Sequence, residues 1–258
     1  MFNHEDMETK KFHRLVGNDS NYEIAFKKPF QRVGTLKTET IKTCLDFSYR
    51  MTFGNEGEHR NHRSGGSIFR NKDQIFMDTF QGKLSEFAFS NIVYKKSGKI
   101  TPDLSVSKLG TWDAFDFKID NRKFCIKSTK FIGNLLLLET KDWDISGNYL
   151  PSTDINKTYD AIVMIRISPD VQKTLKTHLK NFLNEVNFRN FIDRITRVEW
   201  SYDSPGFITN QDFQYILKQK FIIPKGATLN GKTKMDAENY YVQAGDLRPI
   251  EELLEMLS

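Results

Sequence analysis

The sequence predicts an α/β protein in which a central mixed β-sheet is flanked by helices. Residues 73–94 repeat apolar side chains every three or four positions, which is the spacing of an amphipathic helix. Residues 161–165 form an uninterrupted apolar run, typical of a strand that is buried on both faces. Further strand-like and helix-like stretches follow, which excludes all-α and all-β folds and leaves α+β as the related alternative.

The composition is that of a folded globular protein. Of the 258 residues, 38% are hydrophobic and 28% are charged, with a net charge of +5. The longest aliphatic run covers only residues 135–138, and the first twenty residues are polar, so we expect neither a membrane span nor a signal peptide. The two cysteines are too few for a disulfide scaffold or a zinc module. We therefore expect a cytoplasmic protein.

Neither an internal repeat nor a linker rich in Pro, Gly or Ser divides the chain. Residues 1–258 are therefore expected to form one domain, in which residues 1–71 are a peripheral N-terminal part and residues 72–258 contain the core. The peripheral part has β-leaning pieces, at 22–26 and 38–47, and ends in a polar loop at 55–71.

Within the core, the apolar spacing predicts a helix over 73–94, with Asp73 in its first turn. A β-hairpin is expected next, with strands over 112–119 and 123–128 and a tight turn at Asp120-Asn121. The remaining predicted elements are strands at 135–140 and 159–167, a helix from 168 to 186, a second helix over 188–195, a strand at 221–223, an aromatic pair at 240–241 and a final helix over 249–257.

The hairpin contains the residues with the clearest chemical potential. A two-residue turn places Asp116 opposite Cys125, and because side chains alternate between faces, Asp116, Cys125 and Lys127 project to the same side. A carboxylate can hold Mg²⁺, and a neighbouring lysine can orient a water and support a phosphate oxygen. The simpler alternative is an amphipathic hairpin whose polar face is only solvated. The opposite face is apolar and can enter the core; it consists of Phe117, Ile119, Phe124 and Ile126.

The hairpin resembles the active-site hairpin of the PD-(D/E)xK nuclease superfamily, which includes many type II restriction endonucleases. Asp116 matches the first acid, Lys127 matches the lysine, and Ser128-Thr129-Lys130 matches the residues that often follow it. The upstream stretch 82–88, with Glu86, is similar to the family's glutamate-bearing helix. The resemblance spans residues 73–167, and it implies that the backbone carbonyl of Ile126 faces a metal ion.

One position departs from the family pattern, because Cys125 stands where the second acid is expected. Thiolates suit softer metals than Mg²⁺, so either another carboxylate completes the site or the register of the hairpin is displaced. Glu86 is the first candidate and Glu139, at the end of the predicted strand, is the second. Asp113 is a reserve for Asp116, since a β-bulge could exchange their roles. A catalytically inactive relative is the remaining alternative.

The resemblance implies a Mg²⁺-dependent homodimer that cleaves double-stranded DNA at specific sequences, inside a cell of prokaryotic type. The loop at 55–71 offers Arg60, Arg63 and Arg70 beside glycines, and arginine suits both phosphates and base edges. Lys130 is a further candidate DNA contact. The simpler interpretation is that this charged loop is only solvated. A nicking or repair nuclease and a DNA-binding module without cleavage are the alternative functions.

Overall fold

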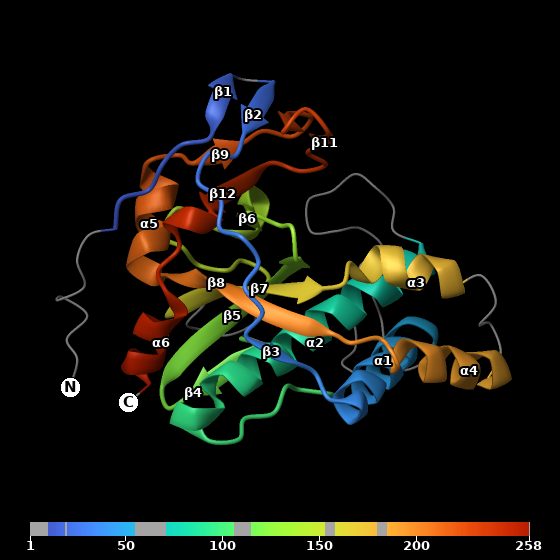
Figure 1. Ribbon diagram of the computed structural model, residues 1–258. Coiled ribbons are helices and arrows are strands. Elements are labelled where there is room, and N and C mark those ends of the chain that lie inside the picture. Colours follow the sequence, from blue (N-terminus) through green and yellow to red (C-terminus); the bar gives the residue numbers. More distant parts are fainter. Residues whose placement is uncertain are drawn as a thin grey trace.

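A five-stranded mixed sheet lies at the centre of the protein (Figure 1). The computed structural model describes residues 10–18, 20–54, 71–105, 115–152, 158–179 and 185–257. β5 and β7 run parallel, and the other neighbours in this sheet are antiparallel. Its strands, in spatial order, are β3 (Gly34–Thr35), β8 (Ser201–Thr209), β7 (Ala161–Ser168), β5 (Arg122–Lys130) and β4 (Phe117–Ile119).

The two inner strands are almost completely buried. β7 is the predicted apolar strand, and only its last residue is partly exposed. All nine residues of β8 are buried, although the sequence did not predict this strand because Asp203, Pro205 and Gly206 interrupt its pattern. Gly206 is required there, since its φ is +139° and a Cβ would meet the Arg248 carbonyl oxygen at 2.0 Å.

Helices cover one face of the central sheet. The 26-residue helix α2 (Lys72–Ser97) runs across the strands, and its buried side includes Phe76, Phe80 and Leu84. This confirms the predicted helix. The other helices that pack into the same core are α1 (Thr38–Phe53), α3 (Val171–Leu179), α4 (Glu185–Ile195) and α6 (Ile250–Met256).

A second, smaller sheet covers the other face and creates a separate core. It contains β6 (Leu135–Glu139), β12 (Asn239–Gln243) and β9 (Ile222–Ile223), and α5 (Asn210–Lys218) packs beside it. Cys125, Ile162 and Met164 of the central sheet face this core. A four-stranded sheet extends from it, formed by β1 (Val16–Asn18), β2 (Asn21–Glu23), β10 (Thr228–Leu229) and β11 (Thr233–Lys234).

Two sequence predictions are corrected by the fold. The β-leaning piece at 38–47 is part of α1, because Ile41, Cys44, Leu45 and Ser48 are buried at helical spacing and this burial outweighs the local β propensity. The predicted helix from 168 to 186 is also wrong in extent. Ser168 ends β7, α3 covers Val171–Leu179, and Val186 belongs to α4. None of the described helices is long and apolar enough to cross a membrane.

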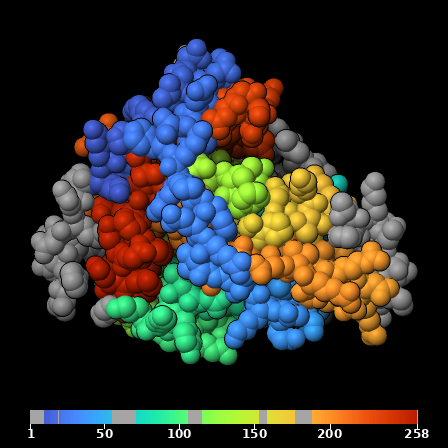
Figure 2. Space-filling view, in the orientation of Figure 1, coloured from blue at the N-terminus to red at the C-terminus, as the bar shows by residue number. Residues whose placement is uncertain are grey.

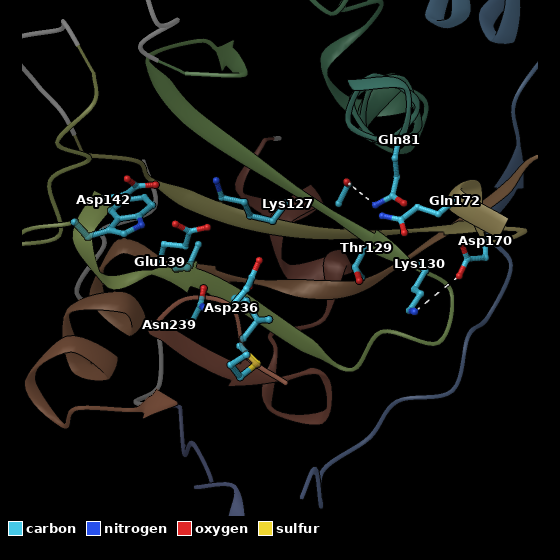
Figure 3. A pocket seen from close by; sticks show the side chains of 15 residues that line it. Gln81, Lys127, Thr129, Lys130, Glu139, Asp142, Asp170, Gln172, Asp236 and Asn239 are labelled. Atoms are coloured by element: carbon cyan, nitrogen blue, oxygen red, sulfur yellow. Dashed lines mark hydrogen bonds and ion pairs between the residues drawn. The ribbon is translucent and has the colours of Figure 1, made fainter. Parts of the chain in front are cut away.

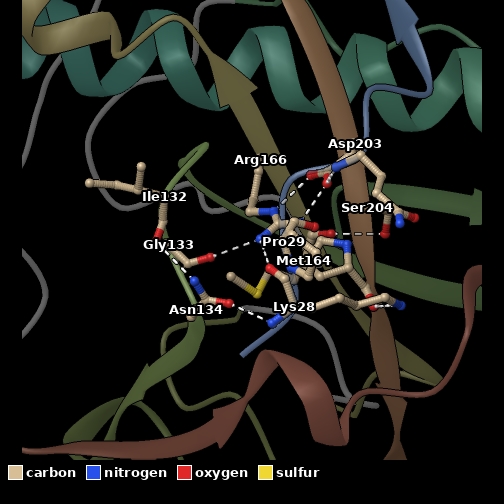
Figure 4. Close-up of polar contacts among 11 residues, drawn as sticks. Lys28, Pro29, Ile132, Gly133, Asn134, Met164, Arg166, Asp203 and Ser204 are labelled. Atoms are coloured by element: carbon tan, nitrogen blue, oxygen red, sulfur yellow. Dashed lines mark hydrogen bonds and ion pairs between the residues drawn. The ribbon is translucent and has the colours of Figure 1, made fainter. Parts of the chain in front are cut away.

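A buried ion pair ties the N-terminal segment to the central sheet (Figure 4). Arg166 of β7 donates to Asp203 of β8 at 2.8 and 2.5 Å, and both side chains are nearly inaccessible to solvent. Arg166 also donates to the backbone carbonyls of Lys28 and Pro29, at 2.7 and 2.9 Å. The segment then continues as a band across the surface towards α1 (Figure 2).

Candidate functional site

The hairpin forms in the predicted register. Phe117 pairs with Phe124 and Ile119 with Arg122, around a turn at Asp120-Asn121 in which Asp120 adopts a φ of +54°. Asp116 is at a bend just before the ladder, where its amide donates to the Phe124 carbonyl at 3.1 Å, so it lies beside the start of β5 rather than in a regular pair with Cys125. The predicted register of the ladder is therefore confirmed, but the predicted pairing of Asp116 with Cys125 is not.

The polar face of the hairpin is covered rather than solvated. Phe117, Ile119 and Phe124 enter the helix-side core, whereas Cys125 is buried in the core beneath the second sheet. The interpretation of an ordinary solvated face therefore does not fit. On this side of the hairpin Lys127 lines a pocket beside the second sheet, whereas Asp116 is not among the residues that line it.

The Asp116 carboxylate is held at the edge of β5. One of its oxygens accepts a hydrogen bond from the Ile126 amide at 2.6 Å. Because the amide and carbonyl of a strand residue point to the same neighbour, the Ile126 carbonyl lies on the same edge as Asp116.

Lys127 is a half-buried cation. Its Nζ lies 5.8 Å from the centre of the Tyr149 ring. Burial alone would lower the pKa of Lys127, but the surrounding Cys125, Tyr149 and Asp116 outweigh burial and raise that pKa above its ordinary value. Lys127 is therefore an ammonium at neutral pH, suited to stabilising negative charge rather than to accepting a proton.

A pocket of about 560 Å³ opens beside Lys127 (Figure 3). One wall consists of four consecutive β5 residues, Lys127 to Lys130. Since consecutive side chains alternate between faces, the pocket wraps around the edge of the strand. Among the described residues, β4 pairs only with Arg122, Lys123 and Phe124 of β5. The edge of β5 at Lys127 to Lys130 is therefore not covered by β4 and borders the pocket.

Acidic side chains from the second sheet stand across the pocket from Lys127. Glu139 ends β6, Asp142 follows three residues later, and Asp236 comes from the segment before β12. The ammonium of Lys127 and the carboxylates of Glu139 and Asp142 point into the same space (Figure 3). The sequence predicts Glu139 as a site residue but not Asp142 or Asp236. The position of Asp142 just after a predicted strand was the available signal, and Asp236 had none.

The remaining predicted residues occupy different places. Glu86 does not line the pocket. Its carboxylate pairs with Lys83 at 2.7 Å, and five residues separate Glu86 from the pocket residue Gln81, about 140° of helix rotation. Lys130 is largely exposed and lies 3.9 Å from Asp170. The candidate residues Arg60, Arg63, Arg70 and Asp113 lie outside the described residues.

The donor set limits which metal the site could hold. Among the described residues, no group of three or more His, Cys, Asp or Glu side chains is placed to hold a metal ion. Mg²⁺ is commonly bound through one or two protein carboxylates, with waters and substrate phosphate oxygens completing its shell. The oxygen donors near Lys127 therefore fit a Mg²⁺ that is also bound by a phosphate of the substrate. They do not form a complete coordination shell by themselves.

Neither cysteine is expected to react in the folded protein. Both thiols are free and buried, and burial raises the pKa of Cys44 above its ordinary range and that of Cys125 to about 12. Titration with Ellman's reagent at pH 8 should therefore detect almost no thiol in the native protein and two after unfolding in guanidinium. Rapid reaction of one thiol in the native protein would contradict the burial of its residue.

The pocket brings a cationic lysine and several acids around a space large enough for a small ligand, and the Asp116 carboxylate is held at the Ile126 amide, outside the lining of the pocket. This combination can bind a phosphate ester and activate it electrostatically. Comparisons of the chain with protein-family models, curated proteins and solved structures find no match.

Proposed function

We propose that the protein is a Mg²⁺-dependent nuclease that hydrolyses phosphodiester bonds of double-stranded DNA, in the manner of the type II restriction endonucleases that its hairpin resembles. The observation that supports this most is the hairpin itself. Asp116 is hydrogen-bonded to β5 at Ile126, and the next β5 residue, Lys127, reaches into a polar pocket that also contains Glu139.

Lys127 has the central role in this proposal. Its ammonium neutralises the charge that develops on the phosphate as the bond to the leaving oxygen breaks, and it helps to orient the attacking water. Charge stabilisation in a pocket is stronger than in bulk water, because the surrounding dielectric is lower. The raised pKa of Lys127 keeps this cation in place throughout the neutral pH range.

Asp116, the Ile126 carbonyl and Glu139 are the groups that would hold Mg²⁺. The ion would supply Lewis-acid polarisation of a phosphate oxygen. Asp116 is already oriented by the Ile126 amide, so this ligand does not need to reorganise when an ion binds. Glu139 approaches from the second sheet, which makes the relative position of the two sheets important for activity.

A DNA-binding module without cleavage is the second candidate. It is favoured by Cys125 at the position of the family's second acid and by the lack, in the described part of the chain, of a three-residue metal group. Incubation with supercoiled plasmid, in Mg²⁺ or in EDTA, separates the candidates. Discrete linear fragments only in Mg²⁺ support the restriction enzyme, and nicked circles or smears support a nicking or repair nuclease. Intact plasmid that is retarded in a gel supports the binding module.

The proposed enzyme acts as a homodimer, because cutting both strands of a palindromic site requires two active sites. Light scattering of the purified protein, alone and with a short duplex, tests this part of the proposal. A monomer under both conditions would favour a nicking enzyme.

The two acids proposed to complete the metal site are expected to behave differently when mutated. Glu139→Gln should lower Mg²⁺-dependent cleavage by at least about tenfold, because the amide retains the shape but removes the charge that attracts the ion. Glu86→Gln should retain cleavage within a few fold, since its carboxylate faces Lys83 away from the pocket. Initial rates over a Mg²⁺ titration measure both effects. Loss of activity in Glu86→Gln but not in Glu139→Gln would identify Glu86 of α2 as the second metal-binding acid.

A further inference from the structure

The lining of the pocket carries more negative than positive charge. Its charged residues are two lysines and four acids, namely Lys127, Lys130, Glu139, Asp142, Asp170 and Asp236, so their formal charges sum to 2 − 4 = −2. A single Mg²⁺ would only neutralise this charge. DNA carries about one negative charge per 1.7 Å of its axis, so the lining by itself does not attract it. Attraction for a DNA backbone must therefore come from residues around the pocket.

Helix α3 forms one border of the pocket and carries exposed lysines. Asp170 and Gln172 line the pocket at the start of this helix. Lys176 lies four residues after Gln172, which places it on the same face of the helix one turn further along. Lys173 follows Asp170 by three residues, and its backbone N–H donates to the Asp170 carboxylate at 3.0 Å. Lys173 and Lys176 are exposed, and among the described residues neither forms an ion pair.

The β10–β11 hairpin forms another border of the same pocket and also carries exposed lysines. Met235 and Asp236 line the pocket, and Lys234 directly precedes them at the end of β11. Lys232 lies in the turn before β11. Both lysines are exposed, and within the described part of the chain neither is in an ion pair. Residues 225–234 contain three lysines and no acid, so no nearby carboxylate of this segment offsets the charge.

We propose that these two borders bind the phosphate backbone of duplex DNA, independently of its sequence, on two sides of the pocket. The α3 rim consists of Lys173 and Lys176, and the hairpin rim consists of Lys232 and Lys234. A lysine ammonium is a compact charge that suits a phosphate, and a phosphate contact positions DNA without reading its bases. This inference rests on the proposed nuclease function, because that function supplies duplex DNA as the partner.

The salt dependence of DNA binding tests this surface. The variants are a double substitution in each rim, Lys173→Gln with Lys176→Gln and Lys232→Gln with Lys234→Gln, and a variant that combines all four. Fluorescence anisotropy with a labelled 30-base-pair duplex in EDTA gives the affinity over a series of KCl concentrations. Each phosphate contact contributes about 0.9 to the slope of log affinity against log salt. Each double variant should therefore lower the slope by about 2, and the combined variant by about 4.

A control with the same change in net charge combines Lys95→Gln, Lys99→Gln, Lys218→Gln and Lys220→Gln. All four side chains are exposed. Lys95 lies about 21 Å along α2 from the pocket residue Gln81, and α5, which ends at Lys218, lies on the opposite side of the molecule from α3 and β11 (Figure 1). This control should keep the wild-type slope. An equal fall in the control would show that only net charge matters and would overturn the surface. A fall in the variant of one rim alone would overturn its two-sided form.

Cleavage assays in Mg²⁺ separate this inference from the proposed function. A wild type that cleaves DNA, but whose salt slope does not change in either rim variant, would overturn the surface and leave the nuclease intact. A wild type that binds the duplex through both rims, yet cleaves no DNA in Mg²⁺, would refute the nuclease and retain the surface. A protein that does not bind the duplex at all would refute both.

Discussion

Lys127→Ala is expected to lower the rate of DNA cleavage by about two to three orders of magnitude while leaving the fold intact. This is the typical cost of removing one preorganised group that stabilises charge in a transition state. The side chain is half-buried at the pocket and is not part of either apolar core, so its loss should change the melting temperature little. Single-turnover cleavage and thermal unfolding measure the two quantities.

Lys118→Ala is the matched control for this variant. Lys118 belongs to the same hairpin and carries the same charge, but it is exposed between the buried Phe117 and Ile119. The Lys118→Ala variant should therefore cleave DNA at the wild-type rate. Lys127→Arg keeps a cation but changes its geometry and should recover only part of the activity. Turnover of Lys127→Ala near the wild-type value would remove Lys127 from the proposed mechanism.

Asp203→Asn is expected to lower the free energy of unfolding by about 3–5 kcal/mol, the usual cost of removing one partner from a buried ion pair. The substitution leaves the Arg166 guanidinium in the centre of the sheet without its counter-charge. The backbone N–H of Gln31 also donates to the Asp203 carboxylate, at 2.8 Å, so the same change weakens the attachment of the N-terminal segment. Urea denaturation followed by circular dichroism measures the loss.

Glu199→Gln provides the comparison for the buried pair. Glu199 accepts from Arg32 at 2.5 Å, but both side chains are more than half exposed. Such a pair contributes about 0–1 kcal/mol, because water and salt screen the charges. Similar losses for Asp203→Asn and Glu199→Gln would show that Arg166 is not held in a buried environment.

The hairpin register followed from the sequence alone because it is a local property. A tight turn at Asp120-Asn121 and strict alternation of apolar residues are sufficient to pair Phe117 with Phe124 and to put Lys127 on the face opposite to theirs. The same applies to α2 and β7, whose apolar patterns extend over many consecutive residues. Such patterns are decided by neighbours in the chain.

Only the tertiary structure decided which acids stand beside Lys127. Glu86 is on a predicted helix but faces α1, since Lys83 holds its carboxylate and packs over the Phe47 ring at 4.6 Å. Asp142 and Asp236 enter the pocket because the second sheet packs across the central one.

β8 shows the same dependence on distant partners. Asp203 is compatible with a buried strand only because Arg166 of the neighbouring strand neutralises it. The sequence by itself therefore determined the helices and strands with long apolar patterns, the hairpin and the face on which Lys127 lies. Burial of charged groups, and contacts between segments a hundred residues apart, depend on partners that local periodicity does not specify.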